Sequence, residues 1–233
     1  MRANFKCVIF DLGDTLFNSG INWDKELKVL REYDLKFSIS DLEKAKMKIW
    51  ENWKKIKFNK EKPVWEYYTL KFLGVKPSWK LAEQIKETFL ETAKKFTAAE
   101  RANPNALEIV KWLAKKGYYL GIISDAYTKH GKKWLSELGI DKHFHHISIS
   151  CEIHYQKDSQ KPFDLFLKKI CKKHKIKLKP EECLMIGDRQ GDLRGKLIGM
   201  KTCLYNPKEK DISNYKIQPD FVIKDFREIK KIV

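Results

Sequence analysis

The stretch VIFDLGDTL, residues 8–16, decides the fold. It begins with apolar residues typical of a buried strand, and we expect that strand over residues 5–10. Asp11 stands where the strand stops, a turn containing Gly13 follows, and Asp14 comes three residues after Asp11. The stretch therefore predicts a strand that presents a carboxylate at its carboxyl end, followed by a tight turn with a second carboxylate.

The next part of the chain has the apolar spacing of helices and no strand signal. Ser40 with Glu43 forms a capping box, Pro63 fits a first helical turn, and Gly74 fits a helix end. These signals predict four helices, at residues 23–33, 41–56, 63–73 and 79–96. We therefore expect residues 19–98 to form an all-helical insert after the first strand.

From residue 103 the pattern changes to helices that alternate with short apolar strands. Such alternation predicts a parallel sheet covered by helices on both faces. The fold class is therefore α/β, with a Rossmann-like core formed by residues 1–18 and 99–233.

Acidic and hydroxyl side chains follow three of the predicted strands. Asp11 follows the first, Ser124 and Asp125 end the second, and Asp188 ends a later one. Ligands of such sheets bind at the carboxyl ends of the strands. Clustered carboxylates repel one another unless a cation lies among them, and a few hard oxygen ligands suit Mg²⁺. The sequence therefore predicts a magnesium site that shares a phosphorylated substrate.

Composition narrows the class of protein. The chain has 233 residues, is 42% hydrophobic, and carries a net charge of +17. Its five cysteines lack zinc-site spacing, so we expect reduced thiols in a cytoplasmic protein without a membrane segment. The lysine-rich stretch at residues 161–179 is better explained by a solvated helix face than by a nucleic-acid patch. The basic charge would still attract an anionic substrate.

Four motifs, in order, resemble those of the haloacid dehalogenase-like (HAD) hydrolase superfamily over essentially the whole chain. They are VIFDLGDTL at residues 8–16, LGIISD at 120–125, QKP at 160–162 and MIGDRQGDL at 185–193. The helical insert has the sequence position of that family's C1 cap. The resemblance implies a phosphatase that attacks phosphorus with Asp11 and forms an aspartyl-phosphate, which water then hydrolyses.

The resemblance also implies the metal ligands. They would be the Asp11 carboxylate, the Gly13 carbonyl and the Asp188 carboxylate, with Asp192 ligating or bracing. A helical lid leaves little room for a macromolecule, so the implied substrate is a small phosphate monoester. No oligomeric state is predicted.

Ser124 and a lysine would hold the phosphate oxygens, according to the same resemblance. Two lysines compete for this position, because EIHYQKDSQKP, residues 152–162, carries a short insertion. We favour Lys161, because KPFDLF opens a helix, and interpret Lys157 as a loop lysine.

The chain departs from the phosphatase pattern at one position. That branch has an aspartate two residues after the nucleophile, which acts as general acid and base, and here the residue is Gly13. General acid catalysis contributes roughly 10²–10⁴-fold in rate. Asp14 is a possible substitute acid or only a turn residue, and both interpretations stay open.

Two alternatives follow from that departure. The first is a 2-haloacid dehalogenase, which also lacks the second aspartate. Two features count against it: Asp125, which we expect at the substrate, would repel a substrate carboxylate, and GDRQGD retains its acidic pair. The other alternative is a catalytically weak member of the fold that still binds Mg²⁺ and phosphate.

Overall fold

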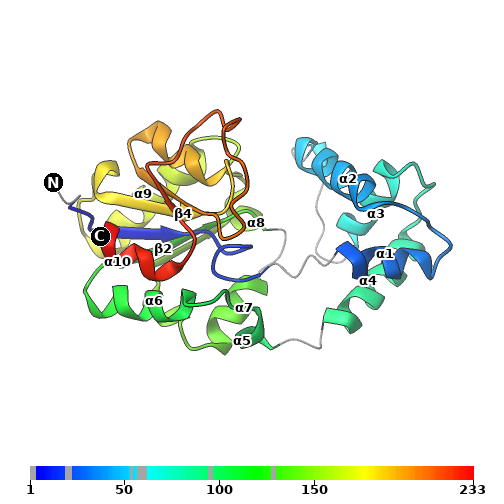
Figure 1. The fold of residues 1–233 in the computed structure, drawn as a ribbon, viewed down its shortest axis with the longest axis horizontal. Coiled ribbons are helices and arrows are strands. Elements are labelled where there is room, and N and C mark those ends of the chain that lie inside the picture. The colour runs from blue at the N-terminus through cyan, green and yellow to red at the C-terminus, as the bar shows by residue number, and fades with distance from the viewer. Residues whose placement is uncertain (1–3, 19–22, 53–54, 57–61, 94–96, 127–129) are drawn as a thin grey trace. The chain divides into compact units, whose positions relative to one another are not determined.

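The computed structural model describes residues 4–18, 23–52, 55–56, 62–93, 97–126 and 130–233. The chain divides into two compact units. One unit combines Met1–Ser19 with Ala98–Val233, and the other is Gly20–Thr97. The first unit contains the sheet and the second contains helices (Figure 1).

The first unit is built on a six-stranded sheet in which every pairing is parallel. The strand order is β3-β2-β1-β4-β5-β6, which places β1 in the interior of the sheet. The strands are β1 (Cys7–Phe10), β2 (Tyr119–Ser124), β3 (His146–Ile149), β4 (Cys183–Gly187), β5 (Lys201–Tyr205) and β6 (Phe221–Ile223). This topology confirms the α/β, Rossmann-like fold class.

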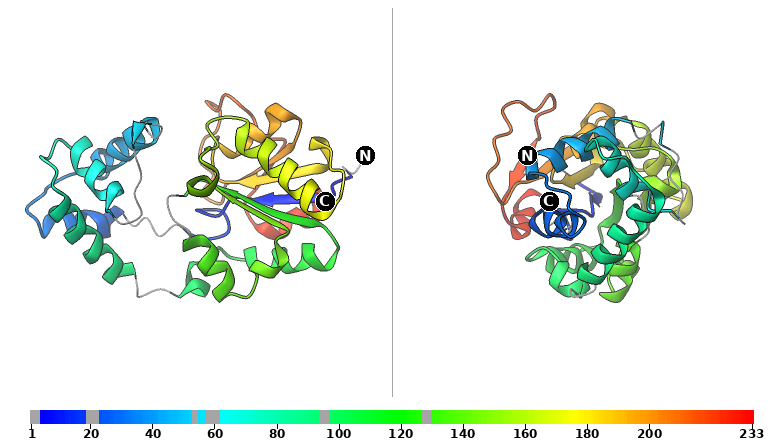
Figure 2. Two further views of the ribbon diagram at one scale, coloured as in Figure 1. Left: turned by 180° about the vertical axis from the view of Figure 1, so that it is seen from behind. Right: turned by 90° about the vertical axis from the view of Figure 1, so that its right-hand side faces the viewer.

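Helices cover both faces of the sheet (Figure 2). Successive strand residues point to opposite faces. Val8 and Phe10 of β1 accordingly pack in one apolar cluster, and Cys7 and Ile9 pack in the other. The helices of this unit are α5 (Ala98–Arg101), α6 (Ala106–Lys115), α7 (His130–Glu137), α8 (Ser150–Ile153), α9 (Lys161–His174) and α10 (Ile229–Ile232).

The two apolar clusters contain different helices. The first includes residues of α6, α7 and α10, and the second includes α9. Gly121 shows how closely α9 approaches β2, because a Cβ atom there would lie 2.0 Å from Cζ of Phe166. A 3₁₀ helix, η4 (Asp192–Ile198), follows β4 in the chain.

The second unit contains no strand among its described residues. Its helices are α1 (Trp23–Arg31), α2 (Ile39–Glu51), α3 (Val64–Phe72) and α4 (Trp79–Ala93). Leu30, Leu42, Leu70 and Ile85 belong to their shared apolar core. The second helix ends at Glu51, earlier than the predicted residue 56, and residues 53–54 lie outside the described residues. The predicted end of the fourth helix, at residues 94–96, also lies outside them.

The start of α2 corrects the predicted capping box. The helix begins at Ile39, before Ser40, so Ser40 is inside it. Ser38 and Asp41 cap each other, because the Ser38 amide donates to Oδ2 of Asp41 at 2.9 Å and the Asp41 amide donates to Oγ of Ser38 at 3.2 Å. The sequence contains two overlapping pairs of serine and acidic residue, Ser38 with Asp41 and Ser40 with Glu43, and the structure forms the first. In the described part of the chain, no helix is both long and apolar enough to cross a bilayer.

Candidate active site

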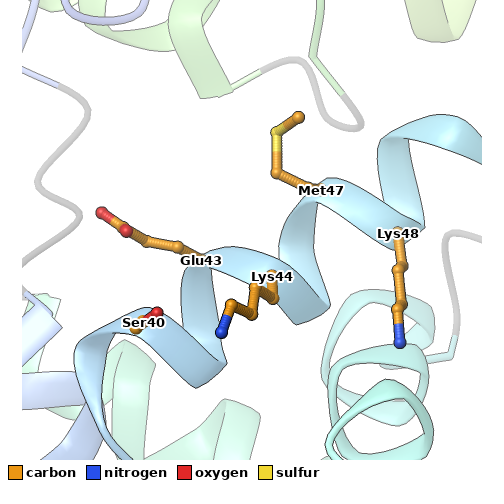
Figure 3. Close-up of a pocket in the computed structure, with 5 residues that line it drawn as sticks. All are labelled: Ser40, Glu43, Lys44, Met47 and Lys48. Atoms are coloured by element: carbon orange, nitrogen blue, oxygen red, sulfur yellow. The ribbon is translucent and has the colours of Figure 1, made fainter.

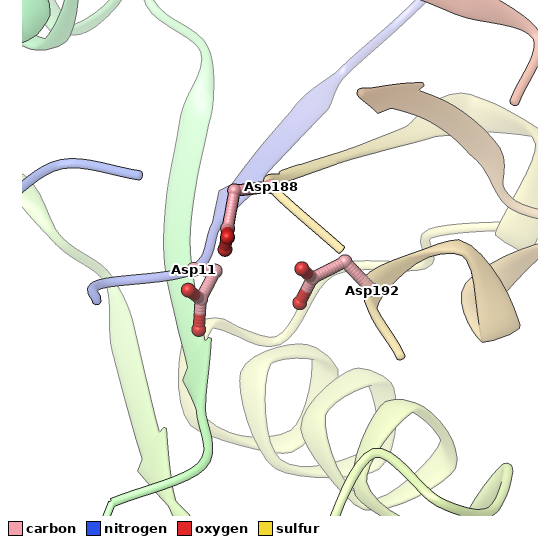
Figure 4. A group of neighbouring side chains, drawn as sticks. All are labelled: Asp11, Asp188 and Asp192. Atoms are coloured by element: carbon pink, nitrogen blue, oxygen red, sulfur yellow. The ribbon is translucent and has the colours of Figure 1, made fainter. Parts of the chain in front are cut away.

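Three carboxylates meet at the carboxyl ends of two neighbouring strands. Asp11 directly follows β1, Asp188 directly follows β4, and Asp192 is the first residue of η4 (Figure 4). One carboxylate oxygen from each lies within 4.8 Å of the others. Because β1 and β4 pair in parallel register, their ends coincide and deliver Asp11 and Asp188 to the same point.

Gly187 allows Asp192 to approach the end of β4. A Cβ atom at residue 187 would lie 2.1 Å from Cγ of Asp192 and 2.3 Å from its Oδ2. The Asp192 side chain therefore occupies the volume that any other residue at 187 would fill. The same Oδ2 atom of Asp192 accepts a hydrogen bond from the Arg189 amide at 3.1 Å, which fixes the carboxylate in this position.

A buried lysine lies against this cluster. The Nζ atom of Lys157 lies 2.5 Å from Oδ1 of Asp11 and also contacts Oδ1 of Asp192. Its third acceptor is the Ile123 carbonyl, at 3.3 Å. Burial by itself lowers the pKa of Lys157, but the carboxylates of Asp11 and Asp192 outweigh it, so that pKa lies above its ordinary value.

The cluster carries more negative than positive charge, and this raises carboxyl pKa values. Burial raises the pKa of Asp188 to about 7, and the charges of Asp192 and Asp11 add to the rise. Burial also raises the pKa of Asp192, although Lys157 acts in the opposite direction. Converging oxygen donors with a deficit of positive charge are the donor set that Mg²⁺ prefers, so Asp11, Asp188 and Asp192 fit a magnesium ion.

Asp125 holds the loop that carries Lys157. Its Oδ1 accepts a hydrogen bond from the Lys157 amide at 3.0 Å, and its Oδ2 lies 3.9 Å from a guanidinium nitrogen of Arg189. Burial raises the pKa of Asp125, with Lys157 and Arg189 opposing. The structure therefore gives Asp125 a contact with the lysine loop, and its place at the substrate stays a prediction.

The structure does not bring Lys161 to the carboxylates. Lys161 is exposed at the first residue of α9, and among the described residues it makes no ion pair with Asp11, Asp188 or Asp192. Lys157, interpreted from sequence as a loop lysine, has the position expected of Lys161. Lys157 lies in the segment between the short helix α8 and α9. This segment therefore brings Lys157 to the carboxylates before α9 begins at Lys161.

Thr15 is a site residue to which the sequence analysis gave no role. Its hydroxyl lies 3.4 Å from Oδ2 of Asp11 and 3.5 Å from Oδ1 of Asp188. Its carbonyl accepts a hydrogen bond from Asn103 at 2.6 Å. Thr15 lies within the opening motif, four residues after Asp11, and that spacing was the available signal. Ser124, the last residue of β2, is buried at the same edge of the sheet.

Gly13 and Asp14 form the turn after Asp11. The backbone of Asp14 is in the left-handed region, with φ of 57°, and its side chain is exposed. The Asp14 amide donates to the Phe17 carbonyl at 2.6 Å, which closes the turn. The turn therefore gives Asp14 a structural role, and its side chain does not share the burial of the carboxylate cluster.

A separate hollow of about 420 Å³ lies on α2 of the helical unit (Figure 3). Met47, exposed by 59%, is its apolar member. The lining residues are Ser40, Glu43, Lys44, Met47 and Lys48. Because it contains a single carboxylate, this hollow has none of the metal-binding chemistry found at the strand ends.

Comparisons with known proteins show which proteins this chain resembles. A family profile described as haloacid dehalogenase-like hydrolase matches residues 5–195. A protein named glyceraldehyde 3-phosphate phosphatase from Pyrococcus furiosus is 30% identical over 98% of this chain and 92% of its own length. One of the same name from Methanopyrus kandleri is 28% identical, over 98% and 97%.

A solved structure shares the fold. It is described as the putative HAD-hydrolase YfnB from Bacillus subtilis bound to magnesium, and it superposes with a TM-score of 0.72 at 18% identity. The similarity covers 98% of both chains. At this level of identity the likeness concerns the fold.

Proposed function

We propose, since this chain belongs to the haloacid dehalogenase-like hydrolase family, that it is a Mg²⁺-dependent phosphohydrolase acting on a small phosphate monoester. The observation that carries the proposal is the convergence of Asp11, Asp188 and Asp192 with Lys157 at the ends of β1 and β4. The phosphatase names of the two curated relatives support it.

Asp11 is the proposed nucleophile. One oxygen of its carboxylate attacks phosphorus, the bond from phosphorus to the leaving oxygen breaks, and an aspartyl-phosphate results. Water then attacks phosphorus and returns Asp11 to its carboxylate form. The position of Asp11 directly after the central strand β1 supports this role, because a rigid element aims the nucleophile.

Asp11, the Gly13 carbonyl, Asp188 and Asp192 are the proposed residues that hold Mg²⁺. When bound, the ion would reduce the repulsion between the phosphate and the carboxylates and stabilise charge on the phosphate oxygens. The excess of negative charge in the cluster supports this assignment.

Lys157 and Ser124 are the proposed ligands of the phosphate oxygens. Lys157 supplies a fixed positive charge next to the nucleophile, and Ser124 supplies a hydroxyl from the neighbouring strand. Preorganised donors of this kind stabilise the charge that spreads over the oxygens during phosphoryl transfer.

The helical unit Gly20–Thr97 is the proposed C1-type cap, which would provide substrate specificity. Its place in the sequence, between β1 and the rest of the core unit, supports this proposal.

The test is phosphate release from a panel of small phosphate esters that includes glyceraldehyde 3-phosphate, with Mg²⁺ and with excess EDTA. We expect release only with Mg²⁺, and we expect Asp188→Ala to weaken the Mg²⁺ dependence more than Asp192→Ala does. Equal rates with Mg²⁺ and with EDTA would contradict the metal assignment. Chloride release from 2-chloropropionate without phosphatase activity would favour the dehalogenase alternative.

A further inference from the structure

Glycine at position 13 is not required by the backbone or by neighbouring atoms. Its φ lies outside the left-handed region that favours glycine, and a Cβ atom added there would meet no heavy atom within 4 Å. By contrast, Gly121 and Gly187 are each pressed against a side chain. An aspartate would therefore fit at residue 13. Neither steric crowding nor backbone conformation explains why a glycine stands there, so we look for the explanation in the reaction.

The described groups that contact Asp11 are poorly placed to protonate a leaving group. The three N–H bonds of the Lys157 ammonium face three acceptors, Asp11, Asp192 and the Ile123 carbonyl. The one hydroxyl hydrogen of Thr15 faces the carboxylates of Asp11 and Asp188. In an in-line displacement the leaving oxygen departs on the side of phosphorus opposite to Asp11, whereas both of these side chains contact Asp11 itself. Asp14 is exposed, and the variant Asp14→Ala tests whether it supplies the proton.

We propose that Gly13 restricts the chain to phosphoryl donors whose leaving group departs as a stable anion, such as acyl and enol phosphates, and disfavours alkyl phosphates. This inference rests on the proposed phosphohydrolase function. Asp11 forms a bond to phosphorus, the bond to the leaving oxygen breaks, and its electron pair stays on that oxygen. A carboxylate or an enolate leaves without a proton, whereas an alkoxide needs one.

The absence of a carboxylate at residue 13 also slows the hydrolysis of the aspartyl-phosphate. Water attacks the phosphorus of the aspartyl-phosphate, the bond to Asp11 breaks, and the proton of the water passes to solvent, because residue 13 offers no carboxylate to accept it. A positioned acid or base contributes roughly 10²–10⁴-fold to such steps. The aspartyl-phosphate of Asp11 therefore accumulates when the first step is fast.

The test compares kcat/KM for 4-nitrophenyl phosphate, phenyl phosphate, acetyl phosphate, phosphoenolpyruvate and glycerol 3-phosphate, all with Mg²⁺. For the wild type we expect glycerol 3-phosphate to be at least about 10²-fold poorer than 4-nitrophenyl phosphate. Acetyl phosphate and phosphoenolpyruvate represent the acyl and the enol class, and at least one of them is expected among the good substrates.

The variant Gly13→Asp restores the missing carboxylate, and Gly13→Asn is its isosteric control. Gly13→Asp should raise kcat/KM on glycerol 3-phosphate at least about 10-fold, and Gly13→Asn should not, because an amide is no acid at neutral pH. Equal rescue by both variants would overturn the proposal. So would loss of alkyl activity alone in Asp14→Ala, which would assign the acid to Asp14.

Rapid-mixing measurements give a second readout. The wild type should release close to one equivalent of 4-nitrophenolate in a burst, and Gly13→Asp should show none. A steady rate from the first turnover in both proteins would contradict the slow second step. If the wild type hydrolyses no phosphate at all, the proposed function fails. If it hydrolyses all five substrates equally well, only this inference fails.

Discussion

The Nζ atom of Lys157 lies 2.5 Å from Oδ1 of Asp11, and both side chains are almost completely buried. An ion pair this deep is stable only while each charge keeps its partner, because a buried charge left alone is strongly destabilising. The pair therefore ties the stability of the fold to the residue proposed to perform the chemistry.

The first prediction compares Lys157→Met with Lys161→Met. Removing the Lys157 ammonium leaves Asp11 and Asp192 without the cation that contacts them both, so the free energy of unfolding should fall by about 3–5 kcal/mol. Mg²⁺ should restore part of that loss, because it supplies positive charge to the same carboxylates. Phosphatase activity should fall at least about 10²-fold.

Lys161→Met removes a similar side chain from an exposed position, so its effect on stability should stay within about 0.5 kcal/mol. Urea unfolding with and without Mg²⁺, together with phosphate release, measures both variants. A greater loss of activity in Lys161→Met than in Lys157→Met would return the role of phosphate-binding lysine to Lys161.

The fold was predictable because its signals are local. The sequence predicted that KPFDLF opens a helix, and α9 begins at Lys161. Asp11, Ser124 and Asp188 were predictable as neighbours because parallel strands end at a common edge. Each of these inferences needed only the periodicity of a segment and the residue at its end.

The lysine was not predictable in the same way, because its position depends on the path of a loop. The sequence shows two lysines four residues apart, and a helix start at the second. What decides between them is tertiary, namely the hydrogen bond from the Lys157 amide to Asp125, 32 residues away. The role of Gly187 is hidden for a similar reason, because its neighbour Asp192 is recognised only in three dimensions.

The second prediction concerns the nucleophile. Asp11→Asn preserves the size of the side chain but replaces the attacking carboxylate with an amide, so turnover should fall below about 1% of the wild type. Circular dichroism should show an unchanged fold. Phosphate release above that level, from protein whose mass spectrum excludes deamidation back to aspartate, would be incompatible with Asp11 as nucleophile.

The third prediction concerns stability in acid. His146 on β3 contacts the hydroxyl of Ser148 at 3.1 Å, and burial lowers its pKa to about 4, helped by Lys169, Lys173 and Lys132. The folded state therefore keeps His146 neutral where the unfolded state, with an ordinary pKa near 6.5, takes up a proton. Its contribution to stability is complete above about pH 6.5 and is lost as the pH falls towards 4.

Because the His146 side chain is partly accessible to water, the loss should be about 1–3 kcal/mol. Urea unfolding between pH 4 and 7 measures it, and His146→Gln should flatten the acid limb of the curve. His154→Asn is the control, since His154 is exposed and asparagine tolerates its left-handed backbone. An acid limb that flattens equally in both variants would show that His146 is not its cause.

The last prediction uses two glycines that are equally crowded but have different neighbours. A Cβ atom at Gly187 would lie 2.1 Å from Cγ of Asp192, and one at Gly121 would lie 2.0 Å from Cζ of Phe166. Gly187→Ala and Gly121→Ala should therefore both destabilise the protein, by about 1–3 kcal/mol, through overpacking. Only Gly187→Ala should weaken Mg²⁺ binding, by about 10–100-fold, because it displaces a carboxylate of the proposed metal site. Calorimetric Mg²⁺ titration of the folded variants, with urea unfolding alongside, separates the two effects. If Gly121→Ala weakens Mg²⁺ binding as much as Gly187→Ala does, the loss follows general destabilisation, and Asp192 has no special part in holding the ion.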